Sequence, residues 1–161
     1  MKFKSIMMMT MVAMAFVTSV CSCSSDDDEP EVAMATQVVG SYTGTEIMTV
    51  SGEDDEGIKT FEFTKASDTS IDMMIPEYGE GAMTLPKFPV KGVTLTKNGN
   101  TITGRLASYE GKVTNASGAE KAYTVSDVTV IFSDKNVVVT FSLKYGNMPF
   151  AFVGKFTGTK Q

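Results

Sequence analysis

Period-two alternation of apolar and polar residues runs through the body of this 161-residue chain and constrains its fold more than any other feature. In the clearest example, one face of a single segment carries the unbroken apolar series Val137, Val139, Phe141, Leu143 and Tyr145. Such alternation puts every second side chain on one side of a β-strand and does not match the 3.6-residue period of a helix. Because no helical period is sustained from residue 38 onward, the sequence predicts an all-β domain.

Turn signals separate the alternating segments at short spacing. The firmest local prediction is a hairpin around Asn98-Gly99, because both residues tolerate the positive φ that a tight β-turn requires. The expected strands are 39–50, 58–64, 70–75, 88–96, 101–108, 123–132, 137–145 and 150–157, with 109–114 as a candidate for a further short strand, which makes eight or nine.

Strands that each present one apolar face must hide it against a second layer or by closing the sheet. A series of hairpins closes most simply into a single antiparallel up-and-down β-barrel of about eight strands, which leaves no exposed edges. A sandwich is the alternative, but it usually needs longer crossovers, and only 76–87 has that length. The residues expected inside the barrel are Phe61, Phe63, Ile71, Met73, Val93, Leu95, Ile102, Leu106, Val130, Phe132, Val139, Phe141, Phe150, Phe152 and Phe156.

The N-terminal segment has the character of an export signal. Lys2 and Lys4 precede an apolar run at 6–20, which at about 1.5 Å per residue is too short to cross a bilayer core of roughly 30 Å. A positive start followed by a run of this length is typical of a signal peptide, and an ordinary N-terminal helix is the alternative. The sequence therefore predicts that residues 1–22 are a leader that is removed.

The residues that follow this run suggest a lipid anchor. Val-Cys-Ser-Cys at 20–23 resembles the bacterial lipobox, which implies that Cys23 is diacylated and attaches the protein to a membrane. Residues 23–37 are expected to form a flexible acidic tether, because their charged start cannot bury apolar area. The acidic run at 24–30 resembles the signal that sends lipoproteins of Bacteroides-type bacteria to the outer face of the outer membrane. A plain spacer on the periplasmic face is the alternative.

Composition excludes several classes of function. The chain has no histidine, and its two cysteines are Cys21, in the leader, and Cys23. Disulfides, zinc sites with Cys or His ligands, and nucleophiles paired with histidine are therefore excluded, and we predict no metal and no cofactor. From Gln37 onward 12 basic residues face 14 acidic ones, a balance of −2, so nucleic-acid binding is not expected. The spacing of the acids marks no catalytic pair, so the protein is not expected to be an enzyme.

The two ends of the body carry a family resemblance. Gly-Ser-Tyr-Thr-Gly-Thr at 40–45 and Tyr-Gly-Asn-Met-Pro-Phe-Ala-Phe-Val-Gly-Lys-Phe-Thr-Gly-Thr-Lys at 145–160 together resemble the calycin-like β-barrel lipoproteins of Bacteroides and relatives. The resemblance covers about the whole body, 38–161, and implies a lipocalin-like barrel whose first and last strands pair. It also implies that Tyr42 closes one barrel end beneath Lys155 or Lys160.

Glu46 is the acid whose position most needs explanation. Counting by twos from Tyr42 puts Glu46 on the interior face, where a carboxyl group costs several kcal/mol unless it is paired or contacts a ligand. The alternative, which we favour, is a β-bulge at Gly44 that exchanges the two faces, buries Ile47 and exposes Glu46. The acids at 53–56 lack the ligand spacing of a calcium loop and are expected at a solvated hairpin tip.

Two functions are compatible with such a barrel. The first is a binding module whose mouth takes a small hydrophobic or amphipathic ligand in a cavity of a few hundred Å³. The second is a protein-interaction or inhibitor module with a filled core, which uses loops such as 51–57 or 76–87 and exposes an apolar patch on one rim. The 76–87 loop is either a lid, through Tyr78, Met83 and Leu85, or an ordered plug. The candidate ligand-binding residues are Tyr42, Glu46, Phe63, Met73, Phe141 and Phe152.

Overall fold

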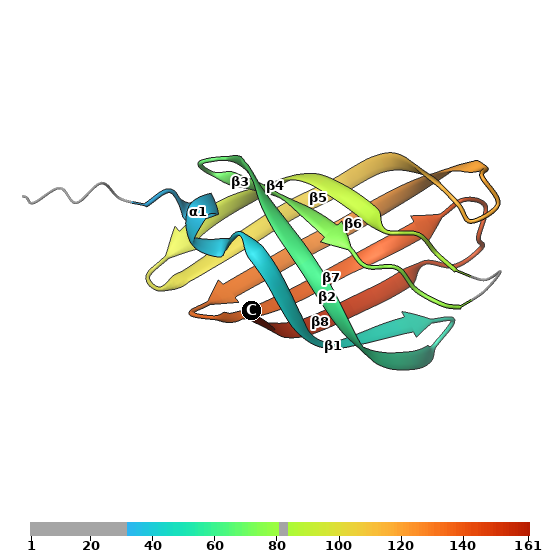
Figure 1. The fold of residues 1–161 in the computed structure, drawn as a ribbon, viewed down its shortest axis with the longest axis horizontal. Helices are drawn as coiled ribbons and strands as arrows, with labels where there is room; N and C mark the ends of the chain where they lie inside the picture. The colour runs from blue at the N-terminus through green and yellow to red at the C-terminus, as the bar shows by residue number, and fades with distance from the viewer. Residues whose placement is uncertain (1–31, 81–83) are drawn as a thin grey trace, which may run out of the picture. The chain divides into compact units, whose positions relative to one another are not determined.

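The computed structural model describes residues 32–80 and 84–161, which contain one short helix and a closed antiparallel barrel (Figure 1). Each strand pairs with the next, and β1 also pairs with β8 from Tyr42 to Val50, which closes the sheet. The predicted up-and-down barrel is thus confirmed. The elements are α1 (Met34–Val38), β1 (Gly40–Val50), β2 (Glu53–Ser67), β3 (Ser70–Ile75), β4 (Phe88–Asn98), β5 (Thr101–Thr114), β6 (Glu120–Ser133), β7 (Asn136–Tyr145) and β8 (Phe152–Lys160).

The acidic run after Gly52 belongs to a strand and not to a loop, contrary to the prediction. Residues Glu53 to Gly57 pair with β1, and only Ser51 and Gly52 remain in the turn, both with positive φ. A polar run carries no alternation, so its hydrogen bonding to β1 was not visible in the hydrophobic pattern. Likewise, the two segments predicted at 101–108 and 109–114 form the single strand β5.

Two β-bulges change which face of a strand points inward. In β4, Val90 and Val93 are both buried because Gly92, at φ +77°, lies between them, and its N–H donates to Asp72 Oδ1 at 3.0 Å. In β6, Val125 and Val128 are both buried, and the pairing with β7 shifts register between Ser126 and Thr129. Bulges of this kind bend a strand locally, which helps a sheet to close into a barrel.

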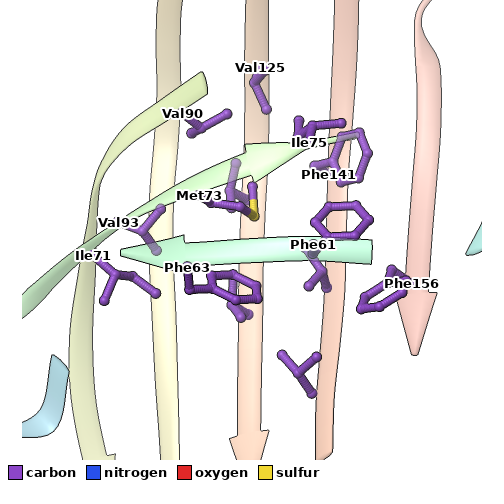
Figure 2. Packing of buried hydrophobic residues seen from close by; sticks show 14 of the residues in the cluster. Phe61, Phe63, Ile71, Met73, Ile75, Val90, Val93, Val125, Phe141 and Phe156 are labelled. Atoms are coloured by element: carbon purple, nitrogen blue, oxygen red, sulfur yellow. The ribbon is translucent and has the colours of Figure 1, made fainter. Parts of the chain in front are cut away.

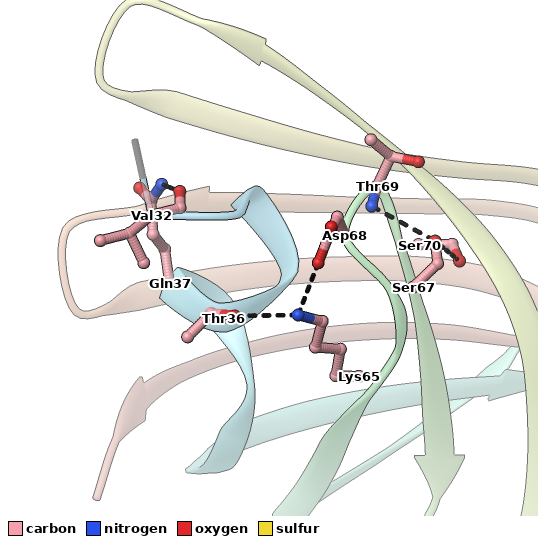
Figure 3. Close-up of polar contacts among 8 residues, drawn as sticks. All are labelled: Val32, Thr36, Gln37, Lys65, Ser67, Asp68, Thr69 and Ser70. Atoms are coloured by element: carbon pink, nitrogen blue, oxygen red, sulfur yellow. Dashed lines mark hydrogen bonds and ion pairs between the residues drawn. The ribbon is translucent and has the colours of Figure 1, made fainter. Parts of the chain in front are cut away.

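The helix α1 lies at one end of the barrel, here called the helix end, and the opposite end, where β1 runs into β2, is called the mouth. Ala35 and Val38 are buried, and the Ala35 N–H donates to the carbonyl of Asp68 in the β2–β3 turn at 3.2 Å. Figure 3 shows that Lys65 joins the same turn to the helix. Its Nζ lies 2.6 Å from Asp68 Oδ1 and 3.5 Å from Thr36 Oγ1.

This packing corrects the expected domain boundary. The tether was predicted to extend to residue 37, but residues 34–37 are helical and help to cover the helix end. Five residues are too few for a helical period to be recognised in a sequence, so the pattern did not reveal them. The predicted leader, 1–22, and residues 23–31 of the predicted tether, with the predicted lipid site Cys23, lie outside the described part of the chain.

Aromatic side chains fill the middle of the barrel (Figure 2). Phe61 stacks on Phe156 with 4.4 Å between ring centroids and lies 6.1 Å from the ring of Phe141. Gly154 makes room for these rings, because a Cβ there would collide with the Phe141 ring. The interior is therefore packed by side chains, as in an ordinary protein core.

The predicted interior residues are buried with two exceptions. Leu106 is only partly buried, and Phe150 is 38% exposed because it lies in the β7–β8 connection, before β8 begins at Phe152. Both residues stand where the alternation meets a turn or a bulge, and there a period of two no longer fixes the direction of a side chain.

Candidate functional site

The predicted ligand-binding residues do not gather at one site. Tyr42 closes the helix end: its hydroxyl donates to the carbonyl of Val38 at 3.0 Å, and its ring packs edge-on against Phe63. Lys160, not Lys155, lies over the Tyr42 ring, with Nζ 5.9 Å from the centroid. The tyrosine therefore occupies the barrel-end position that the family resemblance implied.

The other candidates are distributed along the barrel. Met73 and Phe141 are buried within the packed core, as Figure 2 shows. Phe152, by contrast, lies at the mouth, where it lines a pocket. Only Phe152 and Glu46 of the predicted set therefore belong to the region described next.

The mouth holds a pocket of about 400 Å³, here called the mouth pocket. Its walls come from the ends of β1, β7 and β8 and from three of the connections at this end, β3–β4, β5–β6 and β7–β8. The lining residues are Val50, Thr84, Leu85, Asn115, Ala116, Ser117, Tyr145, Met148, Phe150 and Phe152. A volume of this size is typical of sites for small organic molecules.

A second, smaller pocket of about 170 Å³ adjoins it and is called the side chamber. Val50, Leu85 and Phe152 line both spaces, so the two are separated only by shared side chains. The side chamber differs from the mouth pocket in having an acid in its wall, Asp55 of β2, together with Tyr78 of the β3–β4 connection.

Glu46 points into the barrel near this chamber, and the bulge that we favoured at Gly44 is wrong. The pairing of β1 with both β2 and β8 runs past Gly44 without a register shift, and Glu46 is 2% exposed. Gly44 serves a different purpose from the one expected. A Cβ at that position would overlap the Thr157 carbonyl oxygen and the Cα of Gly158, so glycine permits the close approach of β1 to β8.

The Glu46 carboxyl group is only half satisfied. Oε1 accepts a hydrogen bond from the Tyr78 hydroxyl at 2.8 Å, whereas Oε2 is buried without a hydrogen-bond partner among the described residues. Burial raises the pKa of Glu46 to about 7, although the Tyr78 hydrogen bond and the positive charge of Lys59 oppose the increase. The carboxyl group is therefore mostly protonated in mildly acidic solution.

Hydrogen bonds hold the β3–β4 connection in place at the mouth. Tyr78 and Leu85 form an isolated antiparallel bridge, with N···O distances of 3.1 and 2.8 Å between their backbones. This bridge closes the connection on itself. Lys59 of β2 attaches it to the barrel, since its Nζ donates to the Glu77 carbonyl at 2.9 Å and lies 5.0 Å from the centre of the Tyr78 ring. Burial and the adjacent Glu46 raise the pKa of Tyr78. Met83, the remaining predicted lid residue, lies outside the described residues.

Sequence reasoning missed Tyr145 and Met148 as wall residues of the mouth pocket. Tyr145 ends the apolar series of β7 and looked like one more core residue, yet it carries a hydroxyl group at the position where the strand meets the mouth. The sequence signal that could have identified Tyr145 is its hydroxyl group, which stands at the end of an otherwise apolar series.

Within residues 32–80 and 84–161, no helix is long and apolar enough to cross a membrane, and no cluster of acids is placed to hold a metal ion.

Comparison with known proteins supports the fold alone. No protein-family model matches this chain, and no curated protein is significantly similar to it. A crystal structure of a protein from Bacteroides fragilis, described as a putative outer membrane protein, superposes with a TM-score of 0.61 at 18% sequence identity. The match covers 80% of this chain and 53% of the other, so this chain spans about half the length of that protein.

Proposed function

We propose that this domain is a binding module that takes a small hydrophobic or amphipathic ligand at the mouth of its barrel, without catalysis. The observation that carries the proposal is the mouth pocket, whose wall is built mainly from apolar side chains. Val50, Leu85, Met148, Phe150 and Phe152 supply that wall, and Phe150 is 38% exposed at its edge. Exposed apolar surface that lines a concave site is a usual mark of ligand binding.

The ligand is proposed to bind at the mouth and not in the middle of the barrel. The stacked rings of Phe61, Phe141 and Phe156 already occupy the middle, so a molecule there would have to displace well-packed core side chains. At the mouth, hydrocarbon groups of a ligand would cover apolar side chains at about 25 cal/mol per Å² of buried area.

The uncharged hydrocarbon 1,6-diphenylhexatriene, which fluoresces strongly only in apolar surroundings, tests this proposal. We expect it to bind the wild-type protein, and Phe150→Asp to weaken its affinity at least about tenfold, because the substitution places a charge at the apolar wall. Val153→Asp is the matched control. Val153 is 51% exposed on β8 but does not line the pocket, so its substitution should leave the affinity unchanged. No fluorescence with wild-type protein, or equal loss in both variants, contradicts the proposal.

A protein-interaction module is the second candidate, since a filled core and exposed apolar side chains are what it requires. Ile58 and Val153 are 71% and 51% exposed on the outer surface of the barrel. The experiment with diphenylhexatriene separates the two candidates. Absence of hydrocarbon binding would favour protein interaction through these exposed side chains.

The proposed location of this module is the outer membrane, anchored by a lipid on Cys23 and facing the cell surface. The support is the lipobox-like Val-Cys-Ser-Cys at 20–23 with the acidic run behind it. The proposal places the protein on the membrane through its N-terminus, with the barrel itself in water.

A pair of cysteine substitutions tests the anchor. We expect Cys23→Ser to move the protein from the membrane to the soluble fraction and to remove the mass of the acyl chains, because the sulfur carries the lipid. Cys21→Ser, two residues earlier, should leave both properties unchanged. Fractionation and intact-protein mass spectrometry measure the two effects. Membrane association of the Cys23→Ser variant with unaltered mass would rule out this anchor.

A further inference from the structure

Among the five tyrosines of the chain, Tyr145 alone has a buried hydroxyl without a hydrogen-bond partner among the described residues. The hydroxyl of Tyr42 donates to the Val38 carbonyl, and that of Tyr78 donates to Glu46. The Tyr123 hydroxyl donates to the Pro89 carbonyl, and the Tyr109 side chain hydrogen-bonds to Tyr123. Buried polar groups are nearly always paired, so an unpaired one needs an explanation.

The Tyr145 side chain is held firmly at the wall of the mouth pocket. It is 8% exposed, and its ring meets the ring of Phe88 edge-on at 5.4 Å. Tyr145 lies opposite Tyr123 across the β6–β7 pair, and Tyr123 is fixed by its own hydrogen bond to Pro89. The phenol therefore cannot turn to another partner without disturbing this aromatic packing.

The rest of the pocket wall determines which ligands suit it. Among the described residues, no Asp, Glu, Lys or Arg lines the mouth pocket. The Asn115 side-chain oxygen is already occupied, because it accepts hydrogen bonds from the Ser117 hydroxyl and from the backbone N–H groups of Ser117 and Ala119. Burial raises the pKa of Tyr145, so the phenol stays neutral. Lys121 lines a neighbouring hollow that shares Tyr145 and Met148 with the mouth pocket. Because no charged side chain belongs to the described wall of the mouth pocket itself, desolvation of a charged ligand group there would be costly.

We propose that the ligand is an uncharged amphiphile whose hydroxyl or carbonyl oxygen hydrogen-bonds to the Tyr145 hydroxyl. Its hydrocarbon part lies against Val50, Phe150 and Phe152. Because the Tyr145 hydroxyl is shielded, a wall side chain moves when the ligand enters, and the flexible thioether of Met148 is suited to this. This inference rests on the proposed function and adds to it the chemical class of the ligand.

Displacement of bound 1,6-diphenylhexatriene by two chains with the same number of non-hydrogen atoms tests the inference. The competitors are 1-decanol and 1-chlorodecane, and only the alcohol forms a strong hydrogen bond. In wild-type protein 1-decanol should bind about five to ten times more tightly than 1-chlorodecane, as expected for one hydrogen bond. Tyr145→Phe should abolish this preference. Decanoate at pH 8 should compete at least about tenfold more weakly than 1-decanol.

Tyr42→Phe provides the control, because it removes the same chemical group at the helix end and should leave the preference for the alcohol intact. A second measurement is the melting temperature without ligand. Removal of an unpaired buried hydroxyl should leave the melting temperature of Tyr145→Phe equal to or above that of wild type. A lower melting temperature would show that the hydroxyl has a partner inside the protein and would overturn the inference.

The remaining outcomes separate the two proposals. If diphenylhexatriene does not bind the wild-type protein, the proposed function fails. If it binds, but the preference for 1-decanol is the same in wild type and Tyr145→Phe, or decanoate competes as well as 1-decanol, the proposed function stands and the inference about the ligand class is overturned.

Discussion

The contribution of Glu46 to the free energy of unfolding is expected to fall by about 3 kcal/mol as the pH rises from 4.5 to 7. The unfolded chain loses this proton near pH 4.5, whereas the buried carboxyl group keeps it to about pH 7. Between these values the folded state binds more protons than the unfolded state, so stability falls as pH rises. Above pH 7 the folded protein contains a buried carboxylate whose Oε2 has no partner among the described residues.

Glu46→Gln isolates this effect from the titration of other groups. The amide keeps an oxygen that can accept the hydrogen bond from Tyr78 but carries no charge at any pH. Relative to wild type, the variant should therefore gain about 3 kcal/mol between pH 4.5 and pH 8, measured by urea denaturation at both pH values. Glu62→Gln, at an exposed position of β2, should differ little from wild type at either pH. A pH-independent difference between Glu46→Gln and wild type would refute the expectation.

Replacement of Gly44 by alanine is expected to destabilise the barrel by at least about 3 kcal/mol. The added Cβ would overlap backbone atoms of β8, the Thr157 carbonyl oxygen and the Gly158 Cα, and a backbone cannot move aside as a flexible side chain can. Gly44 lies where the first and last strands meet, so the strain would act on the closure of the whole sheet. Urea denaturation followed by circular dichroism measures the loss.

Gly57→Ala is the matched control for Gly44→Ala. Gly57 lies in the neighbouring strand β2, but the nearest atom to a Cβ there is Lys59 Cε at 4.0 Å. This substitution should be neutral or stabilise the protein by up to about 1 kcal/mol, because it lowers the entropy of the unfolded chain. Equal stability of the two variants would show that β1 and β8 do not need their close contact.

The pattern of side chains predicted the barrel because a strand that is buried on one face carries an apolar residue at every second position. The series from Val137 to Tyr145 is an example, and all five of its apolar residues are buried. Elements that are held by hydrogen bonds do not produce this periodicity in the sequence. The acidic start of β2 pairs with β1 through its backbone. The helix α1 is held by a backbone hydrogen bond to the β2–β3 turn and by the side chain of Lys65 in β2.

The candidate site was harder to predict because it depends on side-chain contacts between distant segments. The alternation of residues counted from Tyr42 correctly placed Glu46 inside the barrel. The preferred alternative, a β-bulge at Gly44, was wrong. Glycine in a strand indicates either a bulge or a close approach of two backbones, and sequence alone does not separate these. The partner of Glu46, Tyr78, lies 32 positions away in a connection without alternation, so their hydrogen bond could not be anticipated.

The position of α1 separates the end at which the chain joins the barrel from the end at which the pocket opens. The polypeptide enters the barrel at the end covered by α1, and the pocket opens at the other. Under the proposed lipid anchor on Cys23, the chain would join the barrel at the covered end, and the opening would lie at the end away from that junction. A ligand would then enter and leave without passing the point where the chain joins the barrel.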